Sequence, residues 1–116
     1  MNGRSIVSGL VALLFGICGV ARAQDADKAP AGAAIFSKKC VLCHGADGTG
    51  STPLGKQLQA ANLHSAAVQK RSDAELHGII HDGQTNMPPF GDQLTDDEID
   101  QVIQYVRTFA GPAKKK

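Results

Sequence analysis

The pentapeptide Cys40-Val41-Leu42-Cys43-His44 constrains this 116-residue chain more than any other stretch of its sequence. Two thiols separated by two residues lie on one side of a helical turn, and an imidazole follows directly. Thiols at that spacing can reach the two neighbouring vinyl groups on one edge of a porphyrin, while the imidazole binds the iron. The pattern therefore predicts a covalently attached c-type haem, with thioethers at Cys40 and Cys43 and with His44 as the proximal ligand.

Other uses of paired cysteines fit this chain less well. A structural zinc site takes four ligands, and only Cys40 and Cys43 remain if Cys18 is removed with the export signal described below. A thioredoxin-like Cys-x-x-Cys belongs to a βαβ context, and the sequence shows no alternation of strand and helix patterns. A disulfide between residues three apart would be strained. Haem attachment is the interpretation that also accounts for a methionine further along the chain.

The first 23 residues have the parts of a secretory signal peptide. A short polar start with Arg4 precedes an apolar run over 6–20, and an Ala-x-Ala cleavage site follows at 21–23. The run is about fifteen residues long, fewer than the roughly 20 that a membrane span needs. A lipoprotein is disfavoured because Ile17 stands where a small residue is expected before a lipidated Cys18. We expect cleavage after residue 23, export to the periplasm and no stable membrane insertion afterwards.

The exported part would be one small domain with a thin core. It would keep three of the four phenylalanines and the single tyrosine, and the chain has no tryptophan. A covalently held haem would supply the missing apolar bulk. Loss of Arg4 and Arg22 would leave 10 of the 12 basic residues against 11 acidic ones. No basic stripe with repeated aromatics is present, so nucleic acid is not an expected partner.

The first helix of this domain is expected to run from about Ala31 to Cys40, with Pro30 suited to a helix start. Gly32, Phe36 and Cys40 recur every four residues and therefore share one face of that helix. A glycine on this face would let another helix approach closely.

Two capping boxes predict two further helices. Ser72 and Thr95 each precede a glutamate by three residues, a spacing that marks helix starts and predicts helices over about 73–81 and 96–110. The second helix carries an apolar stripe and an acidic, solvated face. We expect Tyr105 of this helix to lie where the first and last helices cross.

The stretch from Gly45 to Gly55 is rich in glycine, but it lacks the ending and the preceding strand of a phosphate-binding loop. We expect its backbone to pack flat against the haem edge, where larger side chains would clash. The carbonyl of Pro53 is a candidate acceptor for the Nδ1 hydrogen of His44, and it would fix the ring orientation. A simple turn proline is an equally good interpretation. Residues 54–70 predict a loop with a short helix.

Met87 is the methionine that remains after export, and it precedes two prolines that stiffen a polar loop. A lone methionine is usually core filler. Here a thioether held opposite His44 suits the second axial position, where a neutral, soft donor favours Fe(II) and raises the potential. The alternative ligands are His64, His77 and His81, although surface or hydrogen-bonded histidines are the simpler interpretation of all three.

Together these residues resemble the pattern of class I monohaem cytochromes c, which include small soluble bacterial and photosynthetic proteins and domains fused to oxidases and dehydrogenases. The matching positions are Gly32-x-x-x-Phe36-x-x-x-Cys40-x-x-Cys43-His44-Gly45, Met87-Pro88, Leu94-Thr95-x-x-Glu98-Ile99 and Tyr105-Val106. The resemblance implies an all-α fold of about three to five short helices wrapped around one covalent haem. The chain would then comprise a signal peptide at 1–23, a flexible leader at 24–30, a cytochrome c domain at 31–111 and a basic C-terminal tail at 112–116.

The resemblance also implies His44 and Met87 as axial ligands, so that substrates could not easily reach the iron. We therefore expect a monomeric, periplasmic one-electron carrier and not an enzyme. Redox partner proteins would bind transiently at the exposed haem edge, on an apolar rim formed by Val41, Leu42, Ala46, Pro88, Pro89 and Phe90. Without Met87 bound, a five-coordinate haem could bind or sense a gas, or act as a weak peroxidase. A haem subunit of a larger dehydrogenase or oxidase complex is a further alternative.

Overall fold

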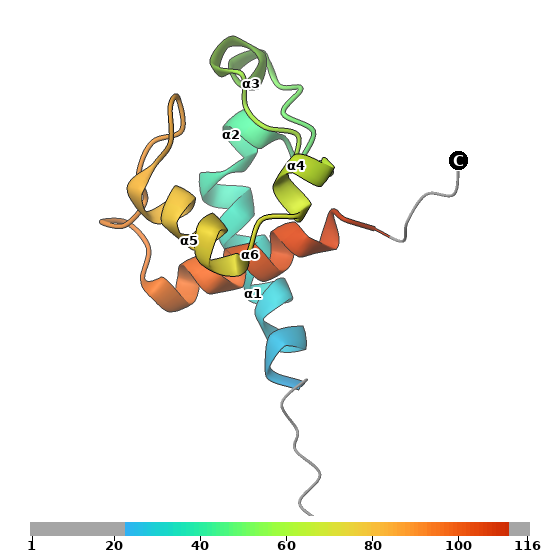
Figure 1. Ribbon diagram of the computed structural model, residues 1–116, viewed down its shortest axis with the longest axis vertical. Helices are drawn as coiled ribbons and strands as arrows, with labels where there is room; N and C mark the ends of the chain where they lie inside the picture. Colours follow the sequence, from blue (N-terminus) through green and yellow to red (C-terminus); the bar gives the residue numbers. More distant parts are fainter. Residues whose placement is uncertain (1–22, 112–116) are drawn as a thin grey trace, which may run out of the picture.

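The computed structural model describes residues 23–111, all of whose regular elements are helices. The expected signal peptide, apart from its last residue, and the basic tail at 112–116 lie outside the described residues. Six helices follow one another along the described chain (Figure 1): α1 Ala23–Lys39, α2 Val41–His44, α3 Pro53–Leu58, α4 Ala66–Gln69, α5 Asp73–Asp82 and α6 Asp96–Thr108. The all-α expectation is confirmed. The number of helices exceeds the expected three to five because α2, α3 and α4 are short pieces of only four to six residues.

Helix α1 differs from the prediction at its start. It is helical from Ala23 and contains Pro30 in its interior, whereas we expected a helix start near Ala31 after a leader at 24–30. Residues 24–29 contain neither glycine nor β-branched residues, and the proline removes only one backbone hydrogen bond of the preceding turn. This first part of α1 also has a partner, because Lys28 Nζ lies 3.7 Å from Asp97 Oδ1 of α6.

Helices α1 and α6 cross in close contact and form the frame of the molecule (Figure 1). A Cβ atom built on Gly32 would lie 1.9 Å from the backbone carbonyl oxygen of Gln101, so only glycine permits this approach. Phe36, one turn further along α1, is 2% exposed and packs against Tyr105 and Phe109, with ring centroids 5.1 and 5.6 Å away. The predicted close approach at Gly32 and the position of Tyr105 are therefore confirmed.

The two predicted capping boxes are both present. Ser72 accepts from the Glu75 amide while Glu75 accepts from the Ser72 amide, and Thr95 and Glu98 do the same at the start of α6. The apolar stripe of α6 fills two adjoining core clusters, which consist of Phe36, Leu63, Val102 and Val106, and of Leu76, Leu94, Ile99 and Ile103. Within residues 23–111, no helix combines the length and apolar character that crossing a membrane requires.

Candidate functional site

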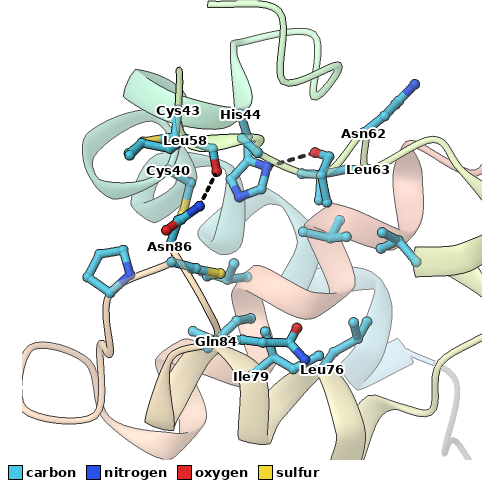
Figure 2. A pocket seen from close by; sticks show the side chains of 18 of the residues that line it. Cys40, Cys43, His44, Leu58, Asn62, Leu63, Leu76, Ile79, Gln84 and Asn86 are labelled. Carbon is cyan, nitrogen blue, oxygen red and sulfur yellow. Dashed lines mark hydrogen bonds between the residues drawn. The ribbon is translucent and has the colours of Figure 1, made fainter. Parts of the chain in front are cut away.

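A cavity of about 820 Å³ lies between the helices, with Cys40, Cys43 and His44 at one end (Figure 2). Its wall is mostly apolar and is supplied by residues of α3 to α6 and the segments between them, including Leu54, Leu58, Leu63, Val68, Leu76, Ile79, Ile80, Phe90, Val102, Ile103 and Val106. Besides the two thiols and the imidazole of His44, two ionisable side chains line the cavity, Lys39 and Arg71. An apolar slot of this size with two cations at its wall suits a large planar ligand that carries carboxylates.

Cys40 and Cys43 bring their sulfur atoms to this cavity from the junction of α1 and α2. The backbone amides of Cys43 and His44 both donate to the carbonyl of Cys40, at 3.2 and 2.9 Å, which winds the motif into a helical turn. No disulfide joins the two cysteines. Burial, and secondarily the neighbouring Cys43, raises the pKa of the Cys40 thiol to about 11. Before haem attachment the Cys40 thiol is therefore protonated at neutral pH, unlike the thiolate of a zinc ligand or a redox-active cysteine.

His44 is oriented by one backbone hydrogen bond. Its Nδ1 lies 3.0 Å from the carbonyl oxygen of Ala61, a contact drawn as a dashed line in Figure 2. Since a carbonyl only accepts, Nδ1 carries the hydrogen and Nε2 keeps its lone pair free for a metal. The acceptor is thus the carbonyl of Ala61. From the sequence we expected the carbonyl of Pro53 as the candidate, and that prediction was wrong. Pro53 instead occupies the first turn of α3, where its missing amide hydrogen costs nothing.

Thr52 is a site residue that the sequence analysis overlooked. Its hydroxyl donates to the carbonyl of Leu42 at 2.8 Å and accepts from the amide of Gly55 at 2.9 Å, so it caps α3 and ties that helix to the pentapeptide. A Cβ atom on Gly55 would lie 2.1 Å from the Cys43 carbonyl oxygen. A threonine directly before a proline is a recognisable capping signal, so the cap of α3 could have been predicted from the sequence, although the bond to Leu42 could not.

We expected the glycine-rich stretch to pack against the haem edge, but the structure places its glycines elsewhere. None of its glycines lines the cavity. Gly48 packs against the ring of Phe109, and a Cβ atom on Gly50 would lie 2.5 Å from the carbonyl oxygen of Ala60. The stretch therefore needs glycine for close packing with other protein segments. The amide of Leu63 also donates to the carbonyl of Gly48 at 2.8 Å, which joins the loop to the segment that carries Ala61.

Met87 lines the same cavity from the loop between α5 and α6. A tight turn presents it: the Met87 amide donates to the Gln84 carbonyl at 2.8 Å, and the Gln84 amide donates back at 3.1 Å. The loop then returns to the end of α5, where the Phe90 amide donates to the carbonyl of Ile80 at 2.9 Å. A Cβ atom on Gly83 would lie 2.8 Å from the Met87 carbonyl oxygen, so glycine lets the loop pack against its own stem.

The other three histidines lie outside the cavity lining. His64 Nε2 lies 2.6 Å from the carbonyl oxygen of Asp47. His77 lies between Asp96 and Asp100 of α6, at 3.2 and 3.1 Å. His81 Nδ1 lies 2.7 Å from Asp82 Oδ1. Of the four histidines in the chain, all within the described residues, only His44 can contact a molecule bound in the cavity.

An apolar cavity with two thiols and an oriented imidazole at one end, and a thioether on a returning loop, defines a c-type cytochrome domain. The chain belongs to the family described as cytochrome c oxidase, cbb3-type, subunit III, whose model matches residues 27–106. The expectation of a class I monohaem cytochrome c is confirmed, as are the haem c cofactor and electron transfer as the activity of the domain.

Relatives of two kinds are similar to this chain. Cytochrome c6 of Thermosynechococcus vestitus (strain NIES-2133 / IAM M-273 / BP-1) is 31% identical over 102 residues, which cover 88% of this chain and 86% of that protein. The cbb3-type cytochrome c oxidase subunit FixP of Sinorhizobium medicae (strain WSM419) is 35% identical over 84 residues, covering 68% of this chain. The chain spans only 29% of that subunit's length. Among solved structures, the KustC0563 c-type cytochrome has a TM-score of 0.62 and 35% identity, covering 67% of this chain and 95% of that one.

Proposed function

We propose that this protein is a periplasmic one-electron carrier whose haem is attached through Cys40 and Cys43, with His44 and Met87 as axial ligands of the iron. The observation that carries the proposal is the position of the two ligands. His44 and Met87 line one cavity from two separate segments, and no other histidine lines it. The bound haem supplies the Fe(II)/Fe(III) couple, and a thioether as the sixth ligand raises its potential.

The role of the protein residues is to hold both ligands still and to keep substrates from the iron. The Ala61 carbonyl fixes the His44 ring, and the hydrogen bonds of the 84–87 turn and of Phe90 restrain the loop that carries Met87. A cage that changes little between the two oxidation states keeps the reorganisation that accompanies electron transfer small. With both axial positions filled from the protein, the chain itself would not act as an enzyme.

Electrons would leave through the part of the expected rim that is exposed. Leu42, between the two cysteines, is 72% exposed and also lines the cavity, and Pro88 is exposed beside Met87. Val41 and Phe90 contribute less, because both are half-buried and packed against the core clusters. A partner that binds this small apolar surface would bury less than about 1,200 Å², as transient redox partners do.

Replacement of the proposed sixth ligand tests the assignment. In Met87→Ala we expect the haem to remain covalently attached, because the thioethers are untouched, while the iron loses its low-spin ferric spectrum and the sulfur-to-iron charge-transfer band. The midpoint potential should fall by tenths of a volt, within the roughly 0.8 V range that axial ligands span. Asp92→Asn is the control, because Asp92 is exposed in the same segment between α5 and α6 and does not line the cavity. An unchanged spectrum and potential in Met87→Ala would remove Met87 from the iron.

Export and assembly are tested separately. A mature holoprotein that begins at Gln24 by intact mass, recovered from the periplasm as a monomer, supports the proposed carrier. The similarity to FixP favours a second function, that of a haem subunit in a larger oxidase complex. Co-purification of a stoichiometric partner under mild conditions would favour that second function.

A further inference from the structure

A single side chain joins the Met87 loop to the opposite wall of the cavity. The amide Nδ2 of Asn86 donates to the carbonyl oxygen of Leu58 at 3.0 Å, across 28 residues of sequence (Figure 2). Within the described residues, this is the one hydrogen bond between the loop at 83–91 and the α3 segment at 53–63. The other hydrogen bonds of the loop lie within it, run to its stem on α5, or join Phe90 to residues 93 and 94.

The acceptor is a carbonyl that needs a donor. Leu58 is the last residue of α3, and the last four carbonyls of a helix have no partner within the helix. Gln59 follows in the left-handed conformation with φ +57°, and its amide donates to the carbonyls of Gly55 and Lys56. The Leu58 carbonyl is therefore left for Asn86. Leu58 also lines the cavity, so the bond lies at the edge of the haem site.

The turn that carries Asn86 leaves its side chain little choice of position. Gln84 and Met87 are joined by two backbone hydrogen bonds, and Thr85 between them has φ +52°. A β-branched residue in the left-handed region is strained, and such a conformation persists only where its surroundings hold it. Asn86 and Met87 are neighbours in this turn, with one bound to α3 and the other lining the cavity.

We propose that Asn86 is a positioning residue that closes the Met87 loop over the haem and so controls how often the sixth coordination position opens. This inference rests on the proposed ligation by Met87. Loop opening matters most in the ferric state, because a thioether binds Fe(III) more weakly than Fe(II). The Asn86 bond therefore sets the access of small ligands to ferric iron, while the ferrous protein is held by its stronger iron–sulfur bond.

The test measures imidazole binding to the ferric holoprotein by stopped flow, in the wild type, Asn86→Ala and Asn86→Asp. An ionised aspartate has nearly the same shape but cannot donate, and it places negative charge beside the Leu58 carbonyl. We expect the opening rate at saturating imidazole to rise by about three- to tenfold in both variants, as the loss of one hydrogen bond implies. Gln57→Ala, an exposed amide removed from α3, is the control and should bind imidazole at the wild-type rate.

The outcomes separate this inference from the proposed ligation. Variants that keep the charge-transfer band and the ferrous spectrum but open faster support the role of Asn86. Opening rates within about 1.5-fold of the wild type in both variants overturn the role of Asn86. The proposal that Met87 is a ligand would still stand if Met87→Ala changed the spectrum and the potential. A wild-type protein without the charge-transfer band overturns both proposals. The far-UV circular dichroism of the ferrous variants should match the wild type, and their unfolding temperatures should fall by only a few degrees, as the loss of one hydrogen bond implies, which checks that their folds are intact.

Discussion

At the scale of single residues, the site depends on side chains that hold backbone in place as much as on the ligands themselves. Thr52 is the best example, because its one hydroxyl caps α3 and also donates a hydrogen bond to the Leu42 carbonyl. It is the contact that fixes α3 against the middle of the pentapeptide. The ring of His44 receives its orientation from Ala61, further along the same wall.

Removal of the Thr52 hydroxyl should destabilise the holoprotein. In Thr52→Val the amide of Gly55 loses its cap and the Leu42 carbonyl loses its donor, and the two losses together should cost about 1–3 kcal/mol of unfolding free energy. Thr52→Ser keeps the hydroxyl and should stay within about 0.5 kcal/mol of the wild type. Denaturant unfolding followed by the haem absorbance gives the comparison. Equal stability of the Val and Ser variants would show that the hydroxyl is not needed.

The chemistry of the site could be predicted from the sequence, but most of the contacts that support it could not. The thiols and imidazole of the pentapeptide are close in sequence, so their spacing alone brings them together, and Met87 stood out in a polar loop. The partner of His44 is different, because the carbonyls of Pro53 and Ala61 are equally able to accept. Only the path of the loop between them decides which one meets the ring. The bond from Asn86 to Leu58 has no sequence signature for the same reason.

At the scale of helices, the crossing of α1 and α6 is the contact with the least tolerance. The two backbones meet at Gly32 and Gln101, with no side chain between them. The four-residue spacing of Gly32 and Phe36 predicted this contact correctly, since both features lie on one helix face. The predicted start of α1 was wrong, because Pro30 was interpreted as a helix boundary. Helix-forming residues on its N-terminal side and the Lys28–Asp97 ion pair favour a longer helix.

Substitution at Gly32 should separate the two helices. In Gly32→Ala the new methyl group would meet the Gln101 carbonyl at 1.9 Å, and because backbone cannot move aside cheaply, we expect a loss of about 2–4 kcal/mol. Gly78→Ala is the control in α5, where a Cβ atom meets nothing within 4 Å. That variant should be more stable by up to about 1 kcal/mol, because alanine favours the helix. Thermal unfolding of both holoproteins measures the opposite signs, and a neutral Gly32→Ala would contradict the crossing.

At the scale of the whole molecule, charged side chains outside the cavity lining join α5 to α6. His77 of α5 lies between Asp96 and Asp100 of α6 and stacks with His81, whose ring centroid is 6.1 Å away. The hydrogen bond to Asp100, and then that to Asp96, raises the pKa of His77 despite some opposing desolvation. The contact is near the surface, so its contribution to stability is less than about 1 kcal/mol.

The stability of the protein should therefore depend on pH through His77. A raised pKa means that the folded state holds the proton more tightly, so the stabilisation is complete below the unfolded pKa of about 6.5 and is lost as the pH rises through the higher folded value. We expect the unfolding free energy to fall from pH 6 to pH 8 by a larger amount in the wild type than in His77→Gln. Parallel pH profiles for the two proteins would show that His77 does not link the helices.

The cavity itself has a consequence for how the protein is made. Its apolar wall draws on both core clusters, so an empty shell would leave a void of about 820 Å³ in the middle of a small domain. We expect a domain this small to be strongly destabilised without the haem, since the apolar wall then loses the contacts that cover it. We therefore expect the haem to be attached before the chain reaches its final packing. Haem attachment and the final folding step would then be coupled, so that only chains that carry the haem would fold stably.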